Sequence, residues 1–174
     1  MKLTWFGKTT FRVHIGGQIL VIDPDAASSR LDRNEVMSGA DQVIAMNGDH
    51  PAANGAAWKP RPAERLLDAG DAPRAAQIWA LGPDSLLIDA DEDMPLLVLG
   101  GDVPPLGRWV ERAAVVLAGG GLALRGAQLA ETVAPRLMAL AGSEAELDAA
   151  FAQLPPLLDG TALLALEPGL AVEV

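Results

Sequence analysis

Three acidic side chains and one histidine follow apolar segments of the sequence at points where they could take part in acid–base or metal chemistry. Asp23 and Asp102 each come directly after such a segment or after the glycines that end it, and Asp49 and His50 close a short loop after another. Residues at strand ends are held by a rigid element and can be aimed at one point. If these four side chains converge, they form an oxygen-rich site with one imidazole, which favours a hard cation.

The supply of other catalytic groups is small. The chain has no cysteine, which excludes thiolate metal sites, disulfides and cysteine nucleophiles, and it has only two histidines, His14 and His50. His14 falls within a predicted strand and is interpreted as a half-buried strand residue. No Gly-x-Ser-x-Gly elbow is present, so a serine hydrolase triad is not supported. The groups left for catalysis or metal binding are therefore oxygen and nitrogen donors.

Composition restricts the partners. The 174 residues are half apolar, enough for one substantial core, so we expect a single domain over 1–174. A net charge of −10 with scattered basic residues argues against binding to nucleic acid or to an anionic membrane. No signal peptide or membrane-spanning run is evident, which favours the cytoplasm. The apolar composition leaves room for a homo-oligomer surface, and the sequence identifies no small-molecule ligand.

The elements that must position these residues change character along the chain. Three antiparallel strands are predicted first, followed by a helix, a strand and a long loop at 46–63, then by short strands, and finally by helices that alternate with strands. This order favours an α+β fold with sheets covered by helices. The predicted strands are 3–6, 9–15, 18–22, 42–45, 65–67, 77–81, 85–88, 96–99, 115–118, 136–140, 161–166 and 171–173, and the predicted helices are 33–38, 106–112, 127–133 and 144–153.

Two smaller patterns bear on packing. Ser143 followed by Glu146 is a capping box, which predicts where the last helix begins. Trp58, Trp79 and Trp109 are interpreted as core or edge packing and not as a platform for stacking a ligand.

Several segments together resemble a known family. Trp-Phe-Gly-Lys-Thr-Thr-Phe at 5–11, Gly-Gly-Gln-Ile-Leu-Val-Ile-Asp-Pro at 16–24, Gly-Asp-His at 48–50 and Gly-Asp at 101–102 occur in this order. They are similar to the metallo-β-lactamase fold superfamily, and more closely to the branch that contains ascorbate phosphate lactonase and related metal-dependent hydrolases. The resemblance implies a compact αββα sandwich with a metal site at the strand ends between two sheets.

The metal ligands of that family are mostly missing here. The family motif is His-x-His-x-Asp-His, and Asp49 and His50 match its last two positions, whereas the two earlier histidines fall on Ala45 and Asn47. Lys8 stands where the branch usually has a histidine, and the late strand-end histidine is absent near Leu140. A zinc hydrolase needs about three strong protein ligands for each catalytic metal, so the zinc pair of the family is not expected.

Three functional classes stay open. The first is a non-catalytic protein, a pseudoenzyme or binding module, with no cofactor. The alternative is a hydrolase of a small phosphorylated or lactone substrate that uses one divalent metal (Mn²⁺, Mg²⁺ or Zn²⁺) at Asp49, His50 and Asp102, with assistance from Lys8 or Asp23. The third is metal-independent acid–base chemistry, with His50 as the base.

If the carboxylates converge without a metal, their mutual repulsion must be relieved by raised pKa values or by a nearby cation. Lys8 is the candidate cation, because the resemblance places its position in the same cleft. We therefore predict that Lys8 pairs with Asp49 or Asp102.

Overall fold

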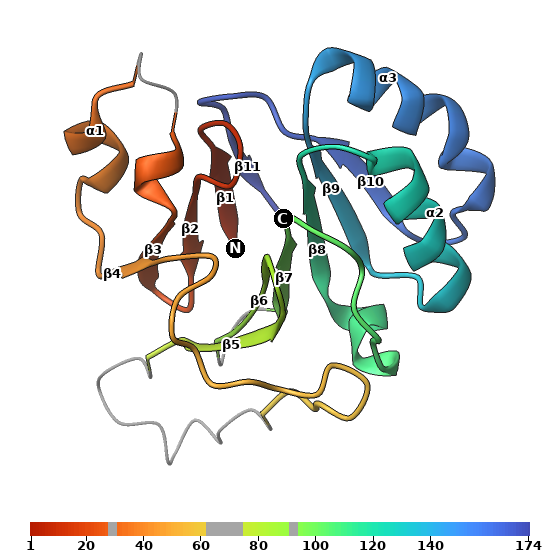
Figure 1. Ribbon diagram of the computed structural model, residues 1–174, viewed down its shortest axis with the longest axis horizontal. Coiled ribbons are helices and arrows are strands. Elements are labelled where there is room, and N and C mark those ends of the chain that lie inside the picture. Colours follow the sequence, from red (N-terminus) through yellow and green to blue (C-terminus); the bar gives the residue numbers. More distant parts are fainter. Residues whose placement is uncertain (28–30, 62–74, 91–93) are drawn as a thin grey trace.

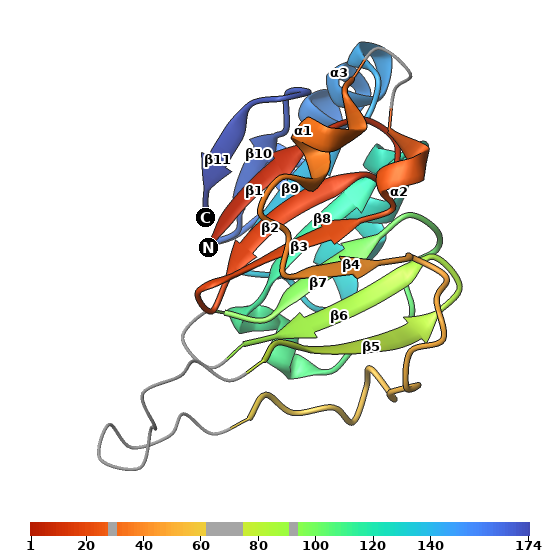
Figure 2. The same ribbon diagram turned by 90° about the vertical axis from the view of Figure 1, so that its left-hand side faces the viewer.

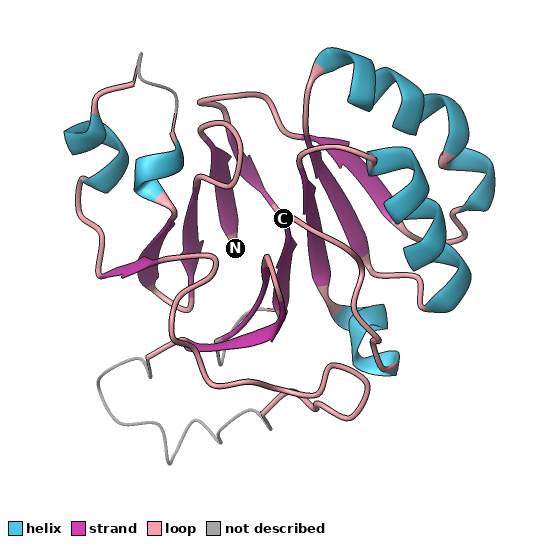
Figure 3. Cartoon of the chain, viewed as in Figure 1, coloured by secondary structure: helices cyan, strands magenta, loops and turns pink. Residues whose placement is uncertain are grey.

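The protein consists of two facing β-sheets with helices on their outer sides. The computed structural model describes residues 1–27, 31–61, 75–90 and 94–174. In Figure 1 the two sheets stand side by side, with α1 beyond one of them and α2 and α3 beyond the other, and Figure 3 shows the same layers by type of element. The predicted α+β class is confirmed.

The first sheet is built mainly from the N-terminal hairpins. Its strands are β1 (Lys2–Trp5), β2 (Phe11–Ile15), β3 (Gln18–Ile22), β4 (Gln42–Ile44) and β11 (Ala171–Glu173), in the order β11-β1-β2-β3-β4. The predicted antiparallel arrangement of the first three strands is confirmed, and β4 joins β3 in parallel. The last strand of the chain pairs with the first, with Lys2 opposite Glu173.

The second sheet holds the remaining strands. They are β5 (Gln77–Gly82), β6 (Ser85–Asp89), β7 (Leu96–Leu99), β8 (Ala114–Ala118), β9 (Leu137–Ala141) and β10 (Ala162–Ala165), in the order β10-β9-β8-β7-β6-β5. Strands β7 to β10 run parallel, and β5 and β6 are antiparallel. Figure 2 shows the first sheet lying across the second. Because parallel strands end at the same edge, the loops after β7 and β8 emerge together.

The main core lies between the two sheets. Alternate residues of each strand point inward, as the period of two predicts. Leu3, Phe11 and Leu20 of the first sheet belong to the same buried cluster as Leu86 and Val98 of the second, and all five are fully buried. This burial of apolar surface is the main source of stability for the sandwich.

The two outer faces are covered unequally. The second sheet carries α2 (Leu122–Thr132), α3 (Glu144–Gln153) and the 3₁₀ turns η2 (Arg108–Arg112) and η3 (Pro155–Leu157). In the part of the chain that the structure describes, the first sheet carries only α1 (Arg33–Met37) and the turn η1 (Pro24–Ala26). None of the helices in the described ranges is long and apolar enough to cross a membrane.

The three tryptophans pack on the second sheet as predicted. The Trp58 ring meets the rings of Trp79 and Trp109 edge to face, with centroids 5.7 and 4.6 Å apart. Trp109 also donates its indole N–H to the carbonyl oxygen of Gly55 at 2.6 Å. This contact fastens the loop after β4 to the second sheet.

Two predicted helices differ from the observed ones. The helix at 106–112 is only the 3₁₀ turn η2, whose preceding residue Gly107 lies so close to Ala56 that a Cβ there would overlap the Ala56 carbonyl oxygen. The helix at 127–133 begins earlier, at Leu122, because Gly126 does not break it: a Cβ on Gly126 would lie 2.7 Å from a methyl group of Leu154. Glycine is used there for close packing.

The other predicted helices and strands that lie in the described residues are present, with bounds shifted by at most a few residues. The predicted strand 65–67, and residues 62–63 of the predicted loop, lie outside the described residues.

The turn between β2 and β3 touches the far sheet. Gly16 has a left-handed backbone, with φ of +55°, and a Cβ added to it would lie 2.7 Å from the Cβ of buried Ala90, just after β6. Gly160 has a similar φ of +77°, and a Cβ there would meet no atom within 4 Å. Comparing Gly16 with Gly160 therefore distinguishes the cost of backbone strain, which both share, from the cost of crowding between the sheets, which applies to Gly16.

We predict that Gly16→Ala destabilises the protein more than Gly160→Ala. A non-glycine residue in the left-handed region costs about 1–2 kcal/mol, and both variants carry that cost. Gly16→Ala adds overpacking of about 1–3 kcal/mol. Urea unfolding measures both changes through the midpoint at constant slope. Equal losses in the two variants would contradict the contact between the sheets at this turn.

Candidate functional site

The polar residues that meet at the strand ends form a group that we call the strand-end cluster: Thr9, Asp23, Asn47 and Asp84. They come from the loop before β2, the end of β3, the loop after β4 and the turn between β5 and β6. Gly100, just after β7, lies between them, because a Cβ added to it would be 3.2 Å from the Thr9 methyl group and 3.5 Å from the Asp84 Cβ. The cluster therefore joins both sheets at one edge.

Asp23 is the most heavily bonded member of the cluster. Its two carboxylate oxygens accept hydrogen bonds at 2.7 Å each, one from the Thr9 hydroxyl and one from the Met46 backbone N–H. Its own N–H donates to the Ile44 carbonyl at 2.8 Å, and its carbonyl accepts from the Thr10 hydroxyl at 2.7 Å. Asp23 has a left-handed backbone, with φ of 43°, a conformation that Asp tolerates better than most residues.

Asn47 and Asp84 form a reciprocal pair across the two sheets. The Asn47 side-chain amide donates to the Asp84 carboxylate at 2.6 Å, and its oxygen accepts from the Asp84 backbone N–H at 2.9 Å. The Asp84 carbonyl in turn accepts from the Gly100 N–H at 2.8 Å. The loop after β4 is thus tied to the end of β7 through one turn residue.

His50 turns back onto its own loop. Its Nε2 lies 2.8 Å from the Ala45 carbonyl oxygen, which can only accept, so Nε2 carries the proton in this contact. The ring also packs against Gly48, where a Cβ would be 2.8 Å from the same nitrogen. Asp49 is exposed and makes no side-chain hydrogen bond or ion pair within the described ranges.

Asp102 lies near a different cation from the predicted one. Asp102 is exposed. Burial of the guanidinium lowers the pKa of Arg125, and the negative charge of Asp102 offsets part of that decrease. Arg125 is 8% exposed and donates to the carbonyls of Leu99 (2.7 Å), Ala118 (2.9 Å) and Gly120 (3.1 Å). This one side chain holds the ends of β7 and β8 together.

The predicted pairing of Lys8 is not formed. Lys8 is exposed, and in the described part of the chain no ion pair joins it to Asp49 or Asp102. Its backbone is left-handed, with φ of 47°, and its carbonyl accepts from the Trp5 indole N–H at 2.9 Å. The neighbouring Thr9 is the residue of this turn that faces the cluster.

The residues do not fit the metal centre that the resemblance implies. No group of three or more His, Asp or Glu side chains in the described residues could hold a metal ion, so Asp49, His50 and Asp102 do not assemble into a ligand set. With two histidines and no cysteine in the sequence, the donors for a zinc pair are lacking.

A neighbouring glycine-rich turn is capped by the protein itself. The Gly119–Gly121 segment leads from β8 into α2, and the first helical N–H, that of Leu122, donates to the Glu146 carboxylate at 3.0 Å. Ser143 accepts from the Glu146 N–H at 3.4 Å and caps α3 as predicted. Glu146 therefore satisfies an orphan donor of the neighbouring helix, where an anion could otherwise bind.

Sequence reasoning misses part of this arrangement. It identifies Asn47 only as a replaced ligand, and it gives no role to Thr9, Asp84 or Arg125. The Gly-Pro-Asp-Ser segment at 82–85 signals a sharp turn, but not that Asp84 reaches across to the other sheet. No signal in the sequence marks Arg125 as buried.

Comparison with known proteins adds no assignment, because no protein-family model and no curated protein sequence matches the chain.

We predict that Asp23→Asn destabilises the protein and that Asp49→Asn does not. The amide introduced at position 23 would keep one acceptor and lose the other, and a hydrogen bond to a charged group contributes about 1.5–3 kcal/mol. Asp49 is exposed and lacks such bonds in the described structure. Thermal and urea unfolding of both variants measure the difference. Similar stabilities for the two would show that Asp23 does not hold the strand ends.

Proposed function

We propose that this chain is a metallo-β-lactamase-like protein whose metal centre has degenerated and that it works without catalysis, as a binding protein. The resemblance in the N-terminal segments supports the family. The two facing sheets with helices on both outer sides are consistent with the αββα arrangement that the resemblance implies.

The observation that carries the proposal is the bonding of Asp23. In the family, groups at the strand ends leave lone pairs for metal ions. Here both carboxylate oxygens of Asp23 are bonded to protein donors at 2.7 Å. A metal would have to displace the Thr9 hydroxyl and the Met46 N–H, and the displaced N–H would then need another acceptor.

The other candidate ligands support the same conclusion. Asn47 and Asp84 bond to each other, and the His50 ring is engaged with Ala45. Hydrogen bonds within the protein therefore join the strand ends, and among the described residues no base is oriented by a carboxylate in the way that acid–base catalysis requires.

The test combines metal binding with activity. We expect Mn²⁺, Mg²⁺ or Zn²⁺ to leave the melting temperature of chelator-treated protein unchanged. Binding would be detected, because a ligand at 100 times its Kd stabilises the folded state by about 2.7 kcal/mol. We also expect no hydrolysis of phosphoester or lactone substrates, with or without Mn²⁺.

Asp49→Ala is the decisive variant, and Asp159→Ala, an exposed carboxylate elsewhere, is its control. Hydrolysis that depends on Mn²⁺ and is lost in Asp49→Ala but kept in Asp159→Ala would overturn the proposal. It would favour a hydrolase with one metal at Asp49, His50 and Asp102.

A further inference from the structure

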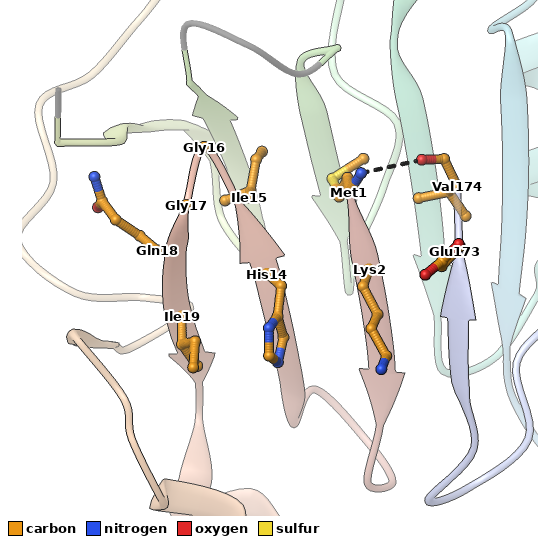
Figure 4. Close-up of a pocket in the computed structure, with 10 residues that line it drawn as sticks. All are labelled: Met1, Lys2, His14, Ile15, Gly16, Gly17, Gln18, Ile19, Glu173 and Val174. Carbon is orange, nitrogen blue, oxygen red and sulfur yellow. Dashed lines mark hydrogen bonds between the residues drawn. The ribbon is translucent and has the colours of Figure 1, made fainter. Parts of the chain in front are cut away.

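A large hollow in the described surface lies at the other end of the first sheet from the strand-end cluster. It has a volume of about 560 Å³ and is lined by residues of β1, β2, β3 and β11, including Lys2, His14, Ile19 and Glu173 (Figure 4). We call it the hairpin hollow, because the turn between β2 and β3 forms one side of it. The residues that build it are separate from those already discussed as metal ligands.

Basic groups are concentrated beside this hollow. Lys2 and His14 are direct cross-strand neighbours on β1 and β2, and His14 is opposite Ile19 on β3. Figure 4 shows the side chains of these three residues extending in the same direction. Arg12 lies two residues before His14 and so on the same face of the strand. Lys2 and His14 line the hollow itself, together with Glu173 of β11, and Arg12 lies outside its lining.

Positive charges act on His14 from its own strand and from the neighbouring one. Burial is the main factor that lowers the pKa of His14, and the charges of Arg12 and Lys2 lower it further. Lys2 forms no ion pair with the described residues, although Glu173 is its cross-strand neighbour on the other side. Like charges directly opposite on neighbouring strands are unfavourable, so an anion placed beside Lys2 and His14 would favour the protonated imidazole.

Among the described residues, Glu173 is the acidic side chain in the lining of the hollow, and it lies beside Lys2, on the other side from His14. The Met1 ammonium donates to the carbonyl oxygen of Val174 at 3.3 Å, so residues 1 and 174, which both line the hollow, lie side by side (Figure 4). Asp41 accepts from the Ile19 N–H at 2.7 Å, and Arg12 donates to the Glu35 carbonyl at 3.3 Å. Neither Asp41 nor Glu35 lies among the groups that line the hollow.

We propose that the hairpin hollow binds a small organic anion, a carboxylate or a phosphate ester, between Lys2 and His14. The anionic group would accept hydrogen bonds from the Lys2 ammonium and the His14 ring, and the apolar part of the ligand would lie against Ile19. Charge-assisted hydrogen bonds of this kind are about twice as strong as neutral ones. Binding is coupled to protonation of His14, so affinity rises as the pH falls through the pKa of that residue.

Nuclear magnetic resonance of the two histidines tests this directly, with the 174-residue chain and no added tag. The probes are butyrate and inorganic phosphate, each compared with sodium chloride at the same ionic strength. We expect the pKa of His14 to rise with at least one probe, and the resonances of His50, which lies outside the hollow, serve as the internal reference. For a site with two charge-assisted hydrogen bonds we expect a Kd on the order of 1 mM.

Matched variants identify the groups. Lys2→Gln should weaken binding about tenfold, since it removes one charge-assisted hydrogen bond, whereas Lys59→Gln, an exposed lysine elsewhere, should leave binding unchanged. His14→Gln should abolish the pH dependence of butyrate binding measured by calorimetry.

Each possible outcome decides the proposal. A response to butyrate alone assigns a carboxylate ligand, and a response to phosphate alone assigns a phosphate ester. The proposal fails if neither probe shifts the pKa of His14, if chloride shifts it equally, or if Lys2→Gln binds as tightly as the unmodified chain. None of these results depends on the strand-end cluster, so this proposal and the one on lost catalysis stand or fall separately.

Discussion

The carboxylate of Asp23 is the constraint on which the strand-end region depends. A left-handed residue after β3 sends its side chain between the loop before β2 and the loop after β4, and both oxygens are bonded there. From this point the Asn47–Asp84 pair continues the connection to the second sheet. The bonds of Asp23 are partly buried, and a polar group there is tolerated because it finds partners inside the protein.

Arg125 plays a comparable part on the second sheet. Its guanidinium is buried and donates three hydrogen bonds to backbone carbonyls at the ends of β7 and β8. A planar group with five donors suits this task, whereas lysine would satisfy fewer of the carbonyls from a single point. Side-chain hydrogen bonds to backbone carbonyls thus hold the ends of β7 and β8 together.

Much of the fold could be predicted from the sequence, because alternation of apolar residues and glycine turns act locally. The hairpins of β1 to β3 and the helix α3, with its Ser143 cap, are examples. Gly126 shows the limit: its place inside α2 depends on Leu154, which is far away in the sequence. The candidate site is less predictable, because Lys8 and Thr9 are adjacent in a turn with a left-handed backbone at Lys8, and the sequence does not say that Thr9 is the one that bonds to Asp23.

The pairing of β1 with β11 has a consequence for how the chain is made. The backbone of β1 at Lys2 cannot hydrogen-bond with β11 at Glu173 until residue 173 has left the ribosome. One edge of the first sheet therefore stays open until then. Contacts so distant along the chain form late, since closing a long loop costs entropy before any contact offsets it. Until residues 171–173 are available, the emerging chain must therefore keep an open strand edge from associating with other chains.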